Sequence, residues 1–204
     1  RLKTALDNVT ANVMVADADY KVIYINETLS QMFQDAEHDV KQDLPHFKAA
    51  DLLGSNIDIF HKNPAHQRGM LDNLSATYKA DLKVGGRSMQ VIATPVFIDG
   101  RRIGTVAEWN DRTAEVAMEE EISEMMIDVQ AGKLDTRLSL DGKQDFFKQM
   151  ATNLNDMQDV LEATFNDISY VMSALKSGDL SNTIDRAYDG IFGEVKDNVN
   201  GTIE

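Results

Sequence analysis

The sequence predicts an α+β domain, a five-stranded antiparallel sheet with helices on one face, followed by an all-α part that pairs with a second chain. Three observations predict it. Residues 1–112 hold all three prolines, all four histidines and the single tryptophan, with most of the runs rich in β-branched residues. Residues 113–204 lack proline, histidine and tryptophan and read as helices joined by glycine-containing connectors. An apolar pattern also recurs in this second part at a fixed spacing, which is typical of tandem units.

Composition limits the class of protein. The 204 residues are 43% apolar and only 7% aromatic, which favours one modest mixed core with slender helical parts. The absence of cysteine excludes disulfides, thiolate metal sites and cysteine nucleophiles, and agrees with a reducing compartment. The net charge of −14 disfavours nucleic acid and anionic lipid, and no apolar run approaches the ~18–20 residues of a membrane span. We expect a cytoplasmic segment of a longer chain.

The first half opens with a predicted β-hairpin. A polar turn separates two short β-rich runs, residues 13–16 and 21–25. Asn26 follows as a helix N-cap, and we expect this helix to end at Phe33. A loop-rich and mostly helical stretch is expected over residues 43–74.

Three further β-rich runs complete the first half, at residues 77–84, 88–97 and 102–109. Gly85-Gly86 and Asp99-Gly100 separate them, and both pairs are strong signals of tight hairpin turns. Two strands, several short helices and a three-strand meander predict five antiparallel strands with the helices on one face.

The second half contains an internal repeat. Residues 122–134 and 168–180 share their apolar positions and a Gly-x-Leu sequence at a spacing of 46. After each connector, Phe147 and Phe192 match at a spacing of 45. Each unit is therefore expected to consist of a helix, a connector and a second helix, and the first unit runs into the second without a break.

A narrow apolar seam with a seven-residue period runs from one unit into the next. It consists of Phe147, Met150, Leu154, Met157, Leu161, Ile168, Val171 and Leu175. Residues 147–175 are expected to form one continuous helix in a parallel homodimer, because a lone helix cannot bury such a stripe. The alternative is one face of a monomeric bundle. Four connector residues are expected to pack on the same bundle: Leu134, Leu138, Leu180 and Ile184.

The hairpin, helical middle and meander, which end at residues 108–113 with Glu-Trp-Asn-Asp-Arg-Thr, resemble a PAS sensor domain. Asp111-x-Thr113 resembles the motif that ends many PAS domains and launches the output helix. The repeat resembles tandem HAMP domains, whose second helix opens with Phe-Gly-Glu-Val, here at residues 192–195. The first unit departs from this opening with Phe-Lys-Gln-Met at residues 147–150. Through the resemblance, Asp111, Thr113 and Glu194 are expected to relay the signal.

The resemblance implies a PAS domain at 1–113 and HAMP domains at 114–160 and 161–204, the second truncated at its end. The HAMP domains are expected to form parallel four-helix bundles between two chains, with a coiled-coil seam. This order resembles soluble methyl-accepting chemotaxis receptors, in particular O₂-sensing poly-HAMP receptors with a haem-binding PAS domain. It implies a haem b iron centre, a diatomic gas ligand (O₂, with CO, NO or cyanide as others) and a downstream kinase-control domain of the same receptor.

The family's axial histidine lies on a short helix in the middle of the domain, and His61 occupies that region. His61 follows the apolar residues Ile57, Ile59 and Phe60, and we expect Pro64 to end their helix. A neutral imidazole in an apolar cleft is the ligand that haem iron requires. His61 is thus the predicted metal ligand, with His66 in reserve; His38 and His46 are expected at the surface.

In the same family a tryptophan on the last strand reaches the bound gas, and Trp109 closes that strand here. Trp109 alternates in phase with Ile103, Thr105 and Ala107, which we expect to face the helix-covered side of the sheet. The indole N–H can only donate a hydrogen bond. A shielded, charge-assisted bond to O₂ would contribute roughly 1–3 kcal/mol. The alternative is that Trp109 only fills the core.

We expect no enzymatic activity. The sequence contains no serine–histidine–aspartate set with supporting spacing, and Gly85-Gly86 lacks the phosphate-binding pattern Gly-x-x-x-x-Gly-Lys. Two other readings stay open. The first is a PAS–HAMP connector that binds a small organic ligand or nothing and serves for dimerisation and relay, and the second is a flavin redox sensor.

Overall fold

A computed structural model describes residues 2–61 and 64–203 of the chain. The chain forms two compact units, residues 1–116 and 117–204. None of the described helices combines the length and the apolar character that a membrane span requires.

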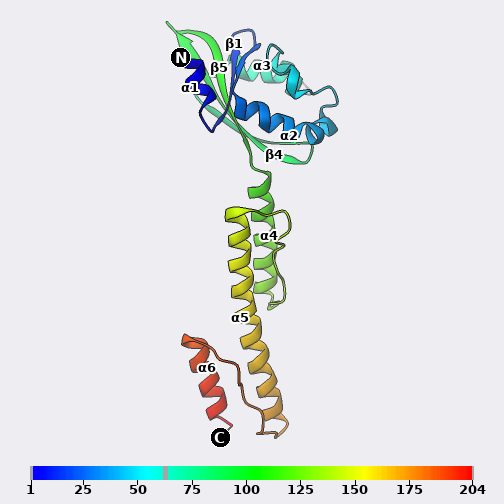
Figure 1. Cartoon of the computed structure of the whole chain (residues 1–204), viewed down its shortest axis with the longest axis vertical. Helices are drawn as coiled ribbons and strands as arrows, with labels where there is room; N and C mark the ends of the chain where they lie inside the picture. The colour runs from blue at the N-terminus through cyan, green and yellow to red at the C-terminus, as the bar shows by residue number, and fades with distance from the viewer. Residues whose placement is uncertain (1, 62–63, 204) are drawn as a thin grey trace. The chain divides into compact units, whose positions relative to one another are not determined.

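The first unit is built on one five-stranded antiparallel sheet in the order β2-β1-β5-β4-β3 (Figure 1). The strands are β1 (Asn12–Asp17), β2 (Val22–Ile25), β3 (Tyr78–Val84), β4 (Arg87–Ile98) and β5 (Arg101–Asp111). Gly85 and Gly86 have φ of 57° and 78°, and Asp99 and Gly100 have φ of 49° and 75°. Two consecutive positive φ values define the hairpin turns whose twist matches that of the strands. The predicted sheet and both predicted turns are confirmed.

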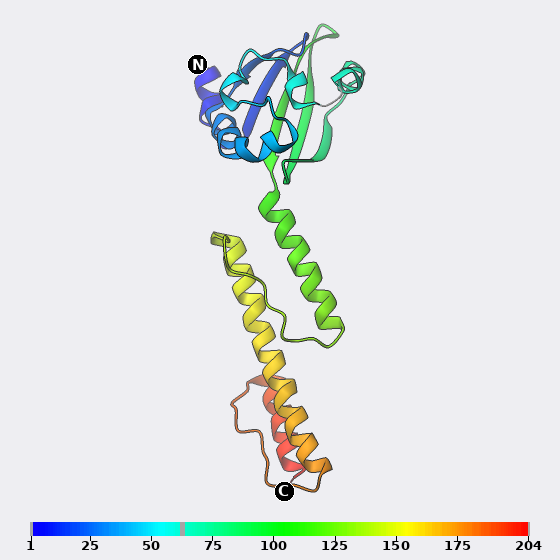
Figure 2. The ribbon, with the colours of Figure 1, turned by 90° about the vertical axis from the view of Figure 1, so that its right-hand side faces the viewer.

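One face of this sheet is covered by helices (Figure 2). These are α2 (Glu27–Asp43), η1 (Ala49–Asp51), η2 (Ile57–Phe60) and α3 (Pro64–Asp72), while α1 (Leu2–Asp7) precedes the sheet. Leu29, Phe33 and Leu52 from the helical side share one buried core with Met14 and Ala107 of the sheet. The predicted layer arrangement is therefore confirmed.

Two predicted helix boundaries need correction. Asn26 caps α2 as expected, because its Oδ1 accepts from the Leu29 amide at 3.2 Å, but α2 continues to Asp43 rather than ending at Phe33. The buried residues Phe33 and Val40 lie on one continuous apolar face, so tertiary packing carries the helix onward. Pro64 does not end the helix before His61. It begins α3, where its missing N–H leaves no hydrogen bond unmade.

The second unit contains α4 (Thr113–Gln130), α5 (Asp145–Lys176) and α6 (Gly190–Gly201). Figure 1 shows α4 and the first half of α5 running in the same direction, joined by a connector that returns along them. The second half of α5 and α6 repeat this arrangement. The prediction of one continuous helix over residues 147–175 is confirmed by α5.

The internal repeat is visible in the hydrogen bonds that end each first helix. Gly132 and Gly178, 46 residues apart, have φ of 81° and 83°. The amide of the next residue donates to a carbonyl five residues back, Lys133 to Asp128 at 2.9 Å and Asp179 to Ala174 at 3.0 Å. This is the same glycine-terminated helix end made twice.

The connectors are held to the following helix by a second repeated contact. Asn155 accepts from the Leu138 amide at 2.8 Å and donates to the Leu138 carbonyl at 2.9 Å. Asn200 makes the same two bonds to Ile184, at 2.9 and 3.1 Å. These asparagines escaped the sequence analysis, although their spacing of 45 matches that of the second helices.

The expectation for the connector residues holds in part. Leu138 and Ile184 are buried and Leu134 is half-buried, but Leu180 is 58% exposed. Asp179 accepts from the Ser181 amide at 2.9 Å, and this local turn keeps Leu180 off the helices of its own chain. The prediction for Leu180 is therefore wrong for a single chain.

Candidate functional site

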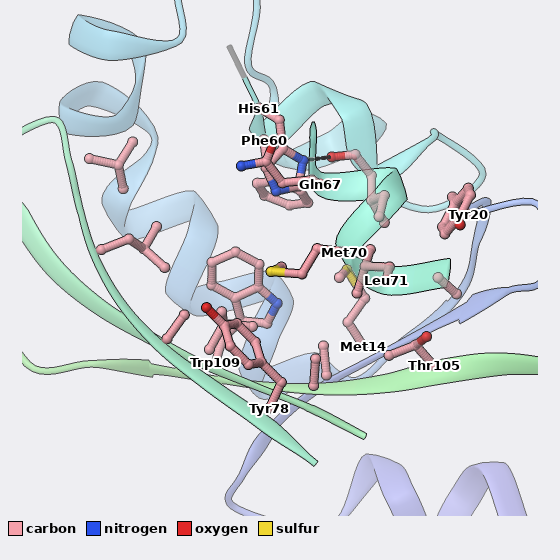
Figure 3. Close-up of a pocket in the computed structure, with 18 of the residues that line it drawn as sticks. Met14, Tyr20, Phe60, His61, Gln67, Met70, Leu71, Tyr78, Thr105 and Trp109 are labelled. Carbon is pink, nitrogen blue, oxygen red and sulfur yellow. Dashed lines mark hydrogen bonds between the residues drawn. The ribbon is translucent and has the colours of Figure 1, made fainter. Parts of the chain in front are cut away.

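A cavity of about 580 Å³ lies between the sheet and the segment η2–α3 (Figure 3). Ligand sites in proteins typically enclose roughly 300–1,000 Å³. Small side chains form its floor on the sheet, namely those of Ala16, Ala80, Ala93 and Ala107. Because these residues project little from the sheet, they leave room for a flat ligand.

His61 lines this cavity from the end of η2 (Figure 3). Its Nδ1 lies 3.0 Å from the carbonyl oxygen of Ile57. A carbonyl can only accept, so Nδ1 carries the proton and Nε2 keeps its lone pair. Burial lowers the pKa of His61, and this outweighs the hydrogen bond to Ile57 and the nearby charge of Asp58, which raise it. The imidazole is therefore neutral at pH 7, with a defined tautomer.

Trp109 lines the same cavity from β5, and its side chain is 6% exposed. Its ring lies 5.2 Å from that of Phe33 and 5.0 Å from that of Phe60, between centroids. These contacts fix the indole, but its Nε1 has no hydrogen-bond partner within the described part of the chain. Buried donors are nearly always paired. The orphaned Nε1 therefore indicates a donor reserved for a ligand.

Gln67 is a second polar residue of the cavity, which the sequence analysis missed. It lies on α3 close to His61 and Phe60 in Figure 3. Its buried Oε1 also lacks a partner among the described residues. A signal was available, because a helix that begins at Pro64 brings Gln67 and Leu71, four residues apart, onto one face.

The expected alternation along β5 holds for Thr105, Ala107 and Trp109, which are all buried. It fails for Ile103, which is 41% exposed. The pairing of β4 with β5 jumps from Val96–Gly104 to Phe97–Arg102, so Ile103 is an extra, unpaired residue. Such a bulge reverses the alternation beyond it.

Arg102 consequently takes the inner face that was expected for Ile103. Its guanidinium carbon lies 5.3 Å from the ring centroid of Tyr20, and its Nη2 donates to Thr105 Oγ1 at 2.6 Å. Both Tyr20 and Thr105 line the cavity. A bulge of this kind leaves no signature that the sequence analysis could have used.

Asp111 and Thr113 meet where β5 passes into α4. The Thr113 amide donates to Asp111 Oδ1 at 3.0 Å, and Thr113 Oγ1 accepts from the Ser88 amide at 3.1 Å. Arg87 donates to Asp111 and to Asp39 of α2, both at 2.7 Å. Burial opposes ionisation of Asp111, but the bonds from Thr113 and Arg87 outweigh it and lower its pKa. Arg87 and Asp39 were missed by the sequence analysis.

The remaining predicted residues lie apart from this cavity or outside the description. His38 and His46 are exposed, as expected. Glu194 is exposed on α6. The side chain of His66 lies outside the described residues. Within the described part of the chain no three His, Asp or Glu side chains gather to hold a bare metal ion.

Comparison with known protein families gives two matches. Residues 1–64 match the PAS domain, and residues 143–204 match the HAMP domain. The HAMP match begins in the first connector, so the predicted unit at 114–160 rests mainly on the internal repeat.

Relatives were found among curated proteins and solved structures. Over 205 residues the chain is 44% identical to methyl-accepting chemotaxis protein McpB of Pseudomonas aeruginosa, and it spans 30% of that protein's length. A structure of the Vibrio cholerae Aer2 receptor, described as a dual PAS-haem oxygen sensor, is 36% identical over 50% of this chain and 94% of that chain, with a TM-score of 0.46. The PAS domain of Bordetella pertussis BvgS is 18% identical over 62% and 95%, with a TM-score of 0.41.

Proposed function

Because this chain contains a PAS domain followed by HAMP units and is homologous to a methyl-accepting chemotaxis protein, we propose that it senses O₂ through haem b and relays the signal within a cytoplasmic chemoreceptor. The chain spans 30% of its relative, so the kinase-control domain that would receive the signal is part of the proposal. The proposed role is binding and relay, without catalysis.

The observation that carries this proposal is the state of His61. Histidines that bind metals commonly donate their second ring N–H to a carbonyl, which orients the ring and fixes its tautomer. His61 does so toward Ile57 at 3.0 Å, and burial keeps the ring neutral. His61 would hold the haem through Nε2, and the small residues of the sheet would accommodate the flat macrocycle.

Trp109 would distinguish the gas-bound from the gas-free site. Haem, when bound, would supply the iron at which a diatomic gas coordinates. The Nε1–H of Trp109 is the unpaired donor of the same cavity and would bind the partly negative gas. The aromatic rings of Phe33 and Phe60 hold the indole and exclude water from it.

The route to the relay helices would begin two residues beyond Trp109. Asp111 ends β5 and binds Thr113, the first residue of α4, so a shift of the strand changes the contacts at the start of the helix. Arg87 ties the same carboxylate to Asp39 of α2. This coupling requires two discrete states of the relay. Glu194 would act further along, in the second HAMP unit.

We propose a parallel homodimer because one chain leaves its apolar seam partly uncovered. Leu154 and Leu161 are half-buried, and Met157 is 45% exposed. Each fully buried large apolar side chain contributes about 1.5–3 kcal/mol. Single cysteines at 154 and 161 should each cross-link to their own copy, and Leu161→Glu should dissociate the dimer in sedimentation experiments. Neither cross-link, together with a monomer at high concentration, would exclude the dimer.

The experiment that tests the haem proposal is a titration of the purified protein with haemin, followed by its visible absorption. Wild type and His38→Ala should bind one haem per chain with a Soret band. His61→Ala should lose stoichiometric binding, and His66→Ala should largely retain it. Binding that survives in His61→Ala but fails in His66→Ala would move the ligand to His66.

The second candidate function keeps the fold and dispenses with haem. The apolar cavity of about 580 Å³ also suits a small organic ligand, in which case the PAS domain would act as a dimerising connector. A flavin would give a visible band in the blue, whereas an organic ligand or an empty site would give no visible absorption. The spectrum of the protein as purified separates these cases.

A further inference from the structure

Arg102 is a nearly buried cation at the edge of the cavity, and nothing in the proposed gas chemistry uses it. Its side chain is 13% exposed. Tyr20 and Thr105, which it contacts, line the cavity away from His61 and Trp109 (Figure 3). The bulge at Ile103 turns Arg102 inward, and bulges of this kind often re-aim a side chain beside a functional site.

The charge of Arg102 is poorly compensated by the described residues around it. The nearest carboxylate oxygen is Asp72 Oδ1, 3.8 Å from Nη1, which is too far for a hydrogen bond. Asp72 is 64% exposed, and the same Oδ1 already accepts the hydroxyl of Tyr20. The Nε of Arg102 is buried and has no partner among the described residues.

The neighbouring arginine differs in this respect. Arg68 also lies over Tyr20, with its guanidinium carbon 5.5 Å from the ring centroid, but it is 44% exposed and paired with Asp58. Buried charges are normally paired, because removal from water is costly without a counter-ion. Arg102 therefore has the burial and the unused donor of an anion-binding residue, and Arg68 does not.

We propose that Arg102 binds a carboxylate of the molecule that fills the cavity, with Thr105 and Tyr20 holding the guanidinium in place. A planar guanidinium matches a carboxylate with two parallel hydrogen bonds. This inference rests on the proposed function in one respect: if haem is the occupant, the carboxylate is a haem propionate. A small organic acid offers the same chemistry.

The first test compares haemin with its dimethyl ester, in which both propionates are blocked. Titrations of the purified protein are followed by the Soret band. The free acid should bind wild type about 10- to 100-fold more tightly than the ester, the range of a buried charge-assisted pair. Arg102→Gln should reduce this preference to nearly onefold, whereas Arg101→Gln, a change at the exposed neighbouring residue, should keep it.

Two results of this test would overturn the proposal. One is equal affinity of wild type for the two haemins, which needs no variant and therefore stands even if Arg102→Gln fails to fold. The other is a preference that survives unchanged in a folded Arg102→Gln protein. Arg102→Lys, which keeps the charge, should retain part of the preference.

A second arm separates this inference from the haem proposal. If neither haemin binds wild type, the haem proposal fails, and octanoate is compared with octanol through the fluorescence of Trp109, the only tryptophan of the chain. Octanoate binding that exceeds octanol binding and depends on Arg102 would support a site for a small organic acid. Octanoate binding that is absent, or independent of Arg102, would overturn the carboxylate site as well.

Discussion

The two units of the molecule use buried polar groups in opposite ways. In the first unit, Trp109 Nε1, Gln67 Oε1 and Arg102 Nε lack partners within the described chain, and they belong to residues in or beside one cavity. In the second unit, the amides of Asn155 and Asn200 are each answered by both polar groups of one main-chain residue. Unpaired groups around a cavity indicate a missing ligand, whereas paired groups fix a frame.

The two repeats of the second unit show that this frame tolerates changes of chemistry. In the first repeat Lys143 binds Glu121 with an Nζ–Oε2 distance of 2.7 Å, and in the second Tyr188 donates to Asp167 at 2.7 Å. Glu121 and Asp167 are 46 residues apart, and Lys143 and Tyr188 are 45 apart. The contact between helix and connector is therefore kept while an ion pair is replaced by a phenol–carboxylate bond.

Removing a frame asparagine should produce the largest effect. Asn155→Ala leaves the N–H and C=O of the buried Leu138 without partners, so we expect the free energy of unfolding to fall by roughly 2–4 kcal/mol. Urea unfolding followed by circular dichroism measures it. Asn153→Ala, at an exposed position on the same helix, is the matched control and should change little. A loss confined to the control range would mean that Asn155 does not fix the frame.

The unpaired donor of the first unit should matter for the ligand rather than for the fold. Trp109→Leu should retain haem and stability but accelerate O₂ dissociation about 10- to 100-fold, because the one hydrogen bond to the gas is lost. Stopped-flow absorption of the oxygenated protein measures this rate. Unchanged O₂ dissociation and autoxidation would assign Trp109 to core packing alone.

Gln158 breaks the comparison, because it is an unpaired polar group in the second unit. Its side chain is fully buried, and neither amide atom has a partner within the described chain. The matching position of the second repeat, 45 residues later, is Ile203. Gln158→Leu should therefore raise the free energy of unfolding by about 1 kcal/mol.

Thermal unfolding checks this prediction, with Gln149→Leu at an exposed position of the same helix as the control. A clear loss of stability in Gln158→Leu would mean that the amide binds something a single chain does not provide, such as its own copy in a dimer. Gln158 would then belong to the frame after all.

Periodic features of the sequence were predictable, and irregular ones were not. The strands, both glycine turns and the continuous helix over 147–175 follow from patterns of period 2 or 7 and from turn chemistry, all of which are local. The end of α2 was missed because packing of Val40, rather than a local stop signal, sets its length. Arg102 was missed because a bulge depends on the pairing of two strands, which one strand's sequence does not encode.

The site was predictable only where a family motif marked it. His61, Trp109, Asp111 and Thr113 were expected through a resemblance, and the structure supplies the tautomer, the unpaired donor and the bond between the last two. Arg87 and Asp39 come together across three elements and have no sequence signal of their own.

Haem ligation by the Nε2 of His61 is tested most directly with His61→Gly and free imidazole. The substitution removes the ring and leaves a space of its size, so imidazole from solution can replace it. We predict that His61→Gly loses stoichiometric haem binding and its Soret band, and that imidazole restores both, whereas wild type needs none. An unchanged spectrum of haem-loaded His61→Gly without imidazole would show that another residue holds the haem.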